Sequence, residues 1–191
     1  MRVLYIFCFL LLSNTLVFGQ KDRVLSYEAG VGATKMTPIT LDGGGNAGLK
    51  VSVYGDLYKK LSPNTSIGAE LSYGNSAGIC VIPKNQDVIS QSTTFNSFEL
   101  LLFARYTFLP ESKVRPFISI GAGSGVYLST DKNYQKTDTS IDAALKTSIG
   151  IKIAGHWRVG INANTPFTFQ GGAMRTDYLF WGVGLHIGYS F

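Results

Sequence analysis

The chain ends on the stretch that decides its fold, Trp181-Gly182-Val183-Gly184-Leu185-His186-Ile187-Gly188-Tyr189-Ser190-Phe191. Every odd position holds a large apolar side chain, and every even position holds a small or polar residue. This alternation with a period of two predicts a β-strand with two chemically opposite faces. A strand that crosses a bilayer needs roughly 9–11 residues, with apolar side chains toward lipid and polar side chains toward the lumen. The stretch therefore predicts a membrane-spanning strand.

The same alternation of apolar with small or polar residues recurs upstream. The connections between successive segments alternate between long and short, as they do in barrels whose neighbouring strands are antiparallel. We therefore predict eight strands. They cover residues 24–33, 48–58, 65–74, 95–108, 114–128, 143–154, 157–165 and 176–191.

The order of the connections and the positions of the aromatic residues both favour a bilayer-spanning barrel. Such barrels have an even number of strands, short periplasmic turns, longer outer loops and an aromatic girdle at each interface. With both ends of the chain in the periplasm, every long connection falls on the outer side. The pattern predicts an all-β fold, an eight-stranded antiparallel up-and-down transmembrane β-barrel. The predicted periplasmic girdle is Tyr27, Tyr106, Phe108, Trp157, Tyr189 and Phe191, and the outer girdle is Tyr73, Phe98, Phe167 and Trp181.

The start of the chain has the form of an export signal. Arg2 precedes an uncharged apolar run at residues 3–12, and small or apolar residues stand before Gln20, where we expect cleavage. A short membrane anchor is the alternative, but a helical span needs about 20 apolar residues. We therefore expect a signal peptide at residues 1–19 and one outer-membrane barrel domain at residues 20–191.

The remaining composition argues against a cofactor and a nucleic-acid partner. Cys8 leaves with the signal peptide, and Cys80 is then alone, so we expect no intrachain disulfide, metal or cofactor. The net charge is +5, but the basic residues are scattered singly among the strands, so we expect no nucleic-acid binding. A mean hydropathy of +0.14 with 22 glycines fits a barrel better than a bundle of helices.

Two neighbouring predicted strands resemble a known family. Residues 98–108 read Phe-Glu-Leu-Leu-Leu-Phe-Ala-Arg-Tyr-Thr-Phe, and residues 115–123 read Arg-Pro-Phe-Ile-Ser-Ile-Gly-Ala-Gly. Both resemble the PorT-like outer-membrane β-barrel domain, although Leu101 stands where that family usually has a proline. More broadly, the chain resembles small barrels of the OmpA/OmpX type. The resemblance implies a bacterial outer-membrane barrel and supplies no catalytic residue.

The end of the chain carries a second resemblance. Phe191, with Tyr189 two residues before it, resembles the C-terminal signal by which outer-membrane barrels are recognised for assembly. It implies the assembly machinery and outer-membrane lipid as partners.

The small or polar face carries four acidic and five basic residues. An eight-stranded barrel is just wide enough for side chains to fill it, and an unpaired buried charge costs several kcal/mol. We therefore expect a paired polar network in the lumen and place Glu70 and Arg105 in one such network. An ion or proton path is the alternative. The nine residues are Glu28, Lys50, Asp56, Glu70, Glu99, Arg105, Lys146, Lys152 and Arg158.

The sequence does not favour catalysis. His186 and Ser190 share a face but stand more than about ten ångströms apart along an extended strand, so they predict no Ser-His pair. No set of residues has usable metal-ligand spacing. We expect no enzyme. A lipid-modifying outer-membrane enzyme and a soluble lipocalin-like binding barrel are the alternatives, and the strand number disfavours a pore.

The long connections are the candidate functional parts. Those at residues 35–47, 75–94 and 129–142 exceed the two to five residues that close a hairpin, and binding residues concentrate on loops held by a rigid scaffold. Residues 75–94 contain an apolar run, so Ile79, Val81 and Ile82 are candidate contact residues. The alternative is that this run only prolongs two strands as a hairpin. We expect a monomer with a structural or surface-interaction role, acting on a surface or periplasmic partner that the sequence does not name.

Overall fold

The computed structural model describes residues 25–39, 44–46, 48–82, 91–131, 136–169 and 178–191. The predicted signal peptide at residues 1–19 lies outside this range, and no described helix has the length and hydropathy of a membrane span. The described residues form strands joined by turns. The strands are β1 (Ser26–Ile39), β2 (Gly44–Asn46), β3 (Gly48–Lys60), β4 (Thr65–Ile82), β5 (Gln91–Thr107), β6 (Val114–Asp131), β7 (Lys136–Ile153), β8 (Trp157–Phe169) and β9 (Tyr178–Ser190).

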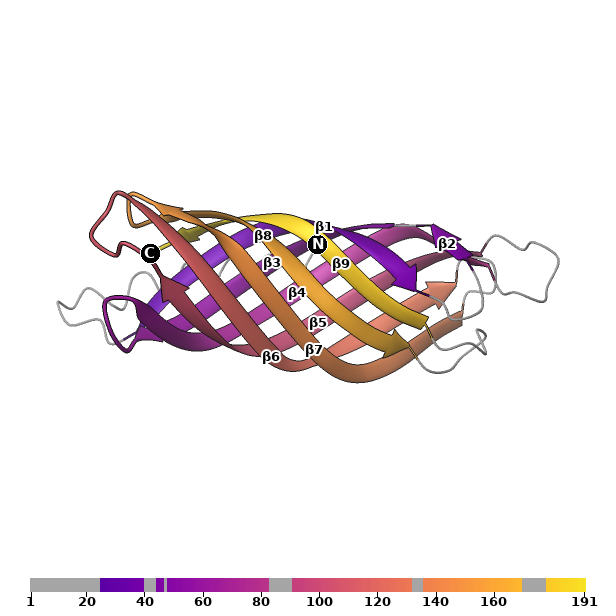
Figure 1. Ribbon diagram of the computed structural model, residues 1–191. Helices are drawn as coiled ribbons and strands as arrows, with labels where there is room; N and C mark the ends of the chain where they lie inside the picture. Colours follow the sequence, from indigo (N-terminus) through magenta and orange to yellow (C-terminus); the bar gives the residue numbers. More distant parts are fainter. Residues whose placement is uncertain (1–24, 40–43, 47, 83–90, 132–135, 170–177) are drawn as a thin grey trace.

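The sheet closes on itself. Each long strand pairs antiparallel with the next, β1 pairs with both β3 and β9, and the additional pairing of β4 with β5 completes the circle. The short β2 pairs with the outer end of β4 alone. Figure 1 shows the long strands crossing the barrel at a steep slant, with the C-terminus at the same end as the short turns. The predicted eight-stranded up-and-down barrel is confirmed.

The two faces of the wall have opposite chemistry. Leu102 and Leu185 point outward and are 71% and 64% exposed, whereas inward Tyr54 and Phe117 are 1% and 2% exposed. Exposed large aliphatic side chains occur on all eight long strands, and side chains this exposed need an apolar solvent. The period-two alternation therefore sorts lipid-facing residues from lumen-facing ones.

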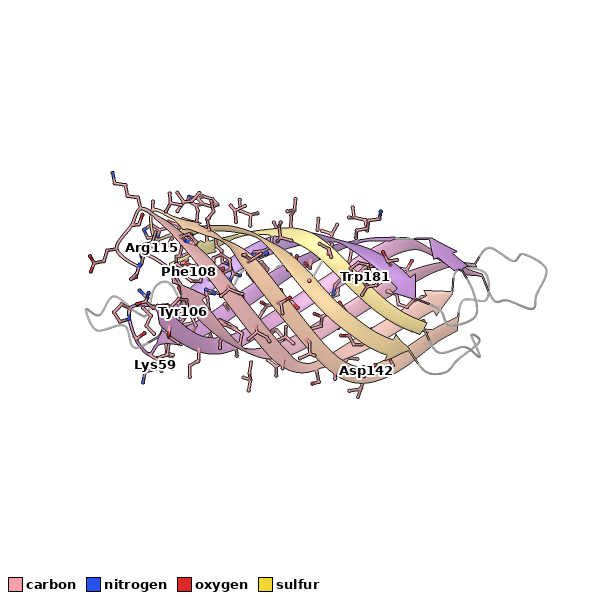
Figure 2. All side chains as sticks on the ribbon, viewed as in Figure 1. Lys59, Tyr106, Phe108, Arg115, Asp142 and Trp181 are labelled. Carbon is pink, nitrogen blue, oxygen red and sulfur yellow. The ribbon has the colours of Figure 1, made fainter. Side chains whose placement is uncertain are left out.

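Exposed aromatic side chains mark both edges of the apolar band. Tyr106 and Phe108 lie near the short-turn end, and Trp181 lies toward the opposite end (Figure 2). From Phe98 to Phe108 the chain advances ten residues, which at about 3.4 Å per residue and a tilt of 35–45° spans about 25 Å along the axis. That height matches the apolar band of outer-membrane barrels. The side chain of Phe167, predicted for the outer girdle, lies outside the described residues.

The turns at the short-turn end are tight, as predicted. In the turn between β7 and β8, Ala154 and Gly155 have φ values of 51° and 77°. A glycine adopts this left-handed conformation without steric cost, which suits the second residue of the turn. Leu109, in the turn before β6, also has a positive φ of 49°.

The outer ends differ from the sequence prediction. Long parts of the predicted loops are strand, because β4 continues to Ile82, β5 begins at Gln91 and β7 begins at Lys136. The connection at residues 35–47 was predicted to be a loop, yet β1 continues to Ile39 and Gly44–Asn46 form β2 opposite Cys80–Ile82.

The prediction was wrong there because it relied on alternation. Above the apolar band both faces of a strand can be polar, so backbone pairing continues without a hydrophobic period. Asn75, Asn96, Thr130 and Thr137 illustrate this region, where Asn75 donates to Asn96 at 2.7 Å and the two threonine hydroxyls lie 3.1 Å apart. Pro166 is the reason that the predicted strand ended at residue 165, because proline disfavours a strand interior. In the structure β8 continues past it, since Pro166 lies in a register shift between Asn164 and Phe167 where the ladder needs no donor.

Candidate functional site in the barrel lumen

The charged residues that the alternation places inside are buried or half-buried in the lumen. Lys146 and Lys152 are half-buried, and the other seven are buried. These seven are Glu28, Lys50, Asp56, Glu70, Glu99, Arg105 and Arg158.

Two arginines and two carboxylates form the central cluster of the lumen. Arg105 Nη2 lies 2.8 Å from Asp56 Oδ2, and Arg105 Nη1 lies 3.4 Å from Glu28 Oε2. Arg158 approaches the same carboxylates from β8, with Nε 2.5 Å from Glu28 Oε1 and Nη1 3.2 Å from Asp56 Oδ2. Each arginine thus contacts both acids, so two positive and two negative charges balance in one buried group.

These ion pairs cross the lumen because residues of like charge are neighbours on adjacent strands. Glu28, Asp56 and Glu70 are direct cross-strand neighbours on β1, β3 and β4. On β6, β7 and β8 the corresponding neighbours are Arg115, Lys152 and Arg158. Like charges directly opposite each other destabilise a sheet. The acidic wall therefore depends on cations that reach it from other strands.

Two further ion pairs lie outside the central cluster. Lys146 Nζ lies 2.6 Å from Glu70 Oε1, and Lys50 Nζ lies 2.5 Å from Glu99 Oε1. Glu70 and Arg105 were predicted to belong to one paired network, but among the described residues their ion pairs are separate, because Glu70 pairs with Lys146 while Arg105 pairs with Glu28 and Asp56. Side chains that project into the lumen can reach past their neighbouring strands, so sequence adjacency of strands did not identify the partners.

Aromatic side chains occupy much of the remaining lumen. The Arg105 guanidinium lies 4.9 Å from the Phe103 ring centroid and 5.3 Å from that of Tyr58. Arg158 lies 5.1 Å from the centroid of Tyr54, and both arginines lie 5.6 Å from that of Phe117. Cations within about 6 Å of an aromatic face are attracted by the ring quadrupole. The cluster is therefore enclosed by rings as well as by charges.

The sequence prediction omitted some of these lumen residues. Arg115 and Phe117 belong to the inward set of β6, because Arg115, Phe117 and Ser119 alternate on one face. Continuing the period back to the first residues of the strand would have found both. Tyr127 and Met36 lie toward the outer end and are 2% and 3% exposed, so the lumen is filled there too.

His186 and Ser190 are both inward but make separate contacts. The buried His186 lies 6.1 Å from the ring of Tyr54 and 6.3 Å from that of Phe117, and within the described part of the chain neither ring nitrogen has a hydrogen-bond partner. Ser190 Oγ accepts a hydrogen bond from Lys152 Nζ at 2.8 Å and donates to Glu28 Oε2 at 3.1 Å. No serine-histidine pair results from this arrangement.

The candidate contact run lies in a paired strand. Ile79 and Val81 of β4 are the register partners of Thr93 and Gln91 of β5, and Val81 and Ile82 also face β2. The run thus prolongs two strands as a hairpin, the alternative in the sequence analysis. The side chains of Ile79, Val81 and Ile82 lie outside the described residues.

The C-terminal residues are held at the seam between β1 and β9. The Phe191 backbone N–H donates to the Tyr27 carbonyl at 2.9 Å. The Tyr189 ring contacts those of Trp157 and Phe191 edge-on, with centroids 5.1 and 5.2 Å apart. The predicted assembly residues are therefore part of the girdle at the short-turn end.

Comparison with known proteins agrees with this geometry. The family model described as outer membrane protein beta-barrel domain matches residues 18–191. The chain belongs to this outer-membrane β-barrel family. It is accordingly a bacterial outer-membrane protein, and the short-turn end faces the periplasm. The alternative of a soluble lipocalin-like barrel does not fit this membership or the exposed aliphatic belt.

Solved structures share the fold of this outer-membrane barrel. Neisserial surface protein A is 12% identical with a TM-score of 0.58, over 86% of this chain and 97% of that one. The outer membrane enzyme PagL is 14% identical with a TM-score of 0.51, over 83% of this chain and 97% of that one. No curated protein matches the chain. Identities this low establish the fold alone.

Proposed function

We propose that this barrel is a non-catalytic interaction protein of the cell surface, acting through the parts of its strands that stand above the membrane. The observation that carries the proposal is how far β4 and β5 continue beyond the apolar band. Tyr73 and Phe98 mark the outer edge of the apolar band, yet β4 continues to Ile82 and β5 begins at Gln91. A paired hairpin of this length is not needed to close the barrel, since two residues suffice for a turn.

The hairpin offers a suitable binding surface. β2 pairs with residues 80–82 of β4, while residues 91–93 of β5 pair with the same part of β4 from the other side. Among the described strands β2 is the last in the sheet order, so its other edge has no strand partner, and an extended segment of a partner can add to such an edge through backbone hydrogen bonds. Outward Asn75 and Asn96 give the base of the hairpin a polar surface.

The packing of the lumen supports a function located outside the lumen. Arg105, Arg158, Glu28 and Asp56 fill the centre with paired charges, and Tyr54 and Phe117 pack against them. The hydroxyl of Ser190 is engaged by Lys152 and Glu28, and not by a histidine. Within the described residues no group of His, Cys, Asp and Glu has the arrangement of a metal site. These observations favour a structural lumen over catalysis or conduction.

The proposal also covers the oligomeric state, the cofactor and the route of insertion. The chain acts as a monomer without a cofactor or nucleic acid, inserted in outer-membrane lipid by the assembly machinery that reads Tyr189 and Phe191. The likeness of residues 98–108 and 115–123 to PorT-like domains supports that subgroup within the family.

The test removes the projecting hairpin and leaves the barrel intact. Ser76 and Phe95 are register partners, so replacing residues 77–94 with Asn-Gly closes the strands in register. A photo-crosslinker at position 96 is retained in both forms and reports contacts in intact cells. We expect a specific crosslinked product from the full-length protein and its loss from the shortened one, with unchanged heat-modifiability.

A matched control shortens a different hairpin. Ser129 and Asp138 are partners on β6 and β7, so replacing residues 130–137 with Asn-Gly is the equivalent change. This variant should keep the crosslink, because residues 77–94, including Ile79, Val81 and Ile82, are intact in it. A triple change of these three residues to serine should weaken it. An unchanged crosslink after removal of residues 77–94 would contradict the proposal.

A further inference from the structure

The periplasmic mouth of the barrel contains a cationic cavity outside the proposed surface site. It lies beneath the turn at residues 61–64 and is lined by residues of β3, β4, β5, β6 and β7. The space open to the centre of a water molecule is about 40 Å³, which accommodates a few waters or one small anion. Its lining includes Lys60, Arg105, Arg115 and Lys152 and contains no aspartate or glutamate. Figure 2 places Arg115 at this end of the barrel.

Among the described residues, Lys152 forms no ion pair with a carboxylate. The ion pairs of Lys50, Lys146, Arg105 and Arg158 engage the carboxylates of Glu28, Asp56, Glu70 and Glu99. Lys152 Nζ instead contacts two neutral hydroxyls, Ser190 Oγ at 2.8 Å and Tyr58 Oη at 3.2 Å. An ammonium has three donors, so one stays available to a ligand in the cavity.

The wall beside Lys152 increases this excess of positive charge. Arg115 is its direct cross-strand neighbour on β6, and like charges at such positions repel. Arg115 Nε donates to the Ser112 carbonyl at 2.8 Å, which fixes the guanidinium near the mouth and leaves its two terminal nitrogens available. An anion between Arg115 and Lys152 would convert their repulsion into two attractive contacts.

A buried polar group also lines the cavity without a partner. Arg105 is 6% exposed, and its Nε has no hydrogen-bond partner among the described residues although its terminal nitrogens pair with Asp56 and Glu28. Leaving a buried donor unpaired is unfavourable, so a ligand that accepts from it would be stabilised. The Ser62 hydroxyl, which accepts from the Asn64 and Thr65 amides, has its own proton to donate.

We propose that this cavity is a binding site for a single phosphate group, held by Lys152 and Arg115 with Lys60 at the entrance. Arginine and lysine beside hydroxyl donors form the usual environment of a bound phosphate. The group has two sources at this membrane face, free inorganic phosphate and the headgroup of an anionic phospholipid of the inner leaflet. Both present negatively charged non-bridging phosphate oxygens, and the periplasmic mouth is accessible to either.

The test uses the mature barrel in maltoside micelles, which contain no phosphate. Backbone amide NMR shifts of Ser62, Asn64, Thr65 and Ser66 are followed while inorganic phosphate is added at constant ionic strength. In a second arm, short-chain phosphatidylglycerol is added to the micelles. Saturable shifts confined to these amides in the first arm identify free phosphate as the ligand, and shifts only in the second arm identify the lipid headgroup. Either result supports the site.

Variants distinguish a specific phosphate site from nonspecific attraction of anions to the positively charged mouth. Lys152→Gln and Arg115→Gln should each weaken binding about tenfold, the effect of losing one charge-assisted contact. Lys59→Gln is the matched control, because Lys59 is exposed at the same end (Figure 2) and does not line the cavity; its affinity should be unchanged. Heat-modifiability shows that each variant is folded, and phosphate should raise the unfolding midpoint of the wild type more than that of Lys152→Gln.

Three outcomes would overturn the proposal. One is no saturable shift with either ligand. Another is an equal loss of affinity in Lys59→Gln and Lys152→Gln, which would mean that only the net charge of the mouth matters. The third is full affinity in both Lys152→Gln and Arg115→Gln. If Lys152→Gln fails to fold, Arg115→Gln decides the question alone, because Arg115 is outside the central cluster.

Discussion

Glu28 is the residue on which the centre of the lumen depends most. It contacts Arg105, Arg158 and Ser190, which come from three different strands, and its side chain is fully buried. A buried pair contributes little net stability compared with apolar residues of equal size, but removal of one member leaves an uncompensated charge. Substitution at this position should therefore be far more damaging than its single charge suggests.

Replacement of Glu28 by glutamine should destabilise the folded barrel by about 3–5 kcal/mol, because two buried guanidinium groups then share one carboxylate. Urea unfolding in lipid vesicles, followed by the fluorescence of Trp157 and Trp181, measures this. Glu111→Gln, in the exposed turn before β6, is the control and should stay within about 0.5 kcal/mol. Equal stability of the two variants would show that the central cluster is not strongly coupled.

Glu70 should be coupled more strongly to Lys146 than to Arg105. The Glu70–Lys146 ion pair measures 2.6 Å, whereas Arg105 is engaged by Glu28 and Asp56. Double-mutant cycles with alanine at each position measure both interaction energies, and contacting pairs give about 0.5–3 kcal/mol. A larger value for Glu70 with Arg105 would favour the pairing expected from strand adjacency over the one in the structure.

Among the elements, β9 carries the clearest sequence signal and closes the barrel. It pairs with both β1 and β8, and its last residues link the seam through the Phe191–Tyr27 hydrogen bond. The alternation of Trp181 to Phe191 specifies its faces because each residue meets either lipid or lumen. Its terminal aromatic residues lie in the periplasmic girdle, where the rings of Tyr189 and Phe191 pack together, and we expect assembly to depend on the same side chains.

Deletion of residues 189–191 should leave the protein periplasmic or degraded. The change removes a girdle tyrosine, Ser190 beside Glu28 and the terminal aromatic residue. Cell fractionation and heat-modifiability on gels measure the result. Phe191→Trp keeps an aromatic side chain and should insert normally. Normal insertion of the deletion variant would separate these residues from assembly.

Alternation predicted elements only where the two faces of a strand differ. The membrane-spanning part of β4 was predicted because Ile67 and Leu71 face lipid while Glu70 faces the lumen. Residues 75–82 of the same strand lie above the band, where that contrast ends, and were predicted to be a loop. Partners across the lumen were also beyond prediction, because the sequence gives the face of each residue but not how far a side chain such as Lys146 reaches.

At the scale of the whole molecule, the filled lumen argues against conduction. Buried rings and ion pairs occupy it from Phe117 near the periplasm to Tyr127 near the outer end. Eight strands leave an interior just wide enough for side chains. The interior of the barrel is therefore a packed core, and the wall around it faces lipid.

Reconstituted in planar bilayers, the wild-type protein should show no steady single-channel conductance. The reason is that the ions would have to displace the buried groups around Arg105 and Arg158, which are held by charge and by aromatic rings. A porin reconstituted in the same membranes is the positive control. Steady channels that survive repurification would show that the lumen opens and would restore the ion path as a function.

The opposed rows of like charge have a consequence for how the chain becomes a barrel. Glu28, Asp56 and Glu70 belong to the first strands, while Arg105, Lys146 and Arg158 come from the later ones. Neither half of the polypeptide can neutralise its interior by itself, and only closure of the circle brings the two together. Lys50 and Glu99 are the exceptions to this order, but a partly formed barrel would still carry an inner wall with a net charge of one sign, which repels a second copy of the same half and attracts the missing one. The charge order thus favours completion within one chain over exchange of strands between neighbours during insertion.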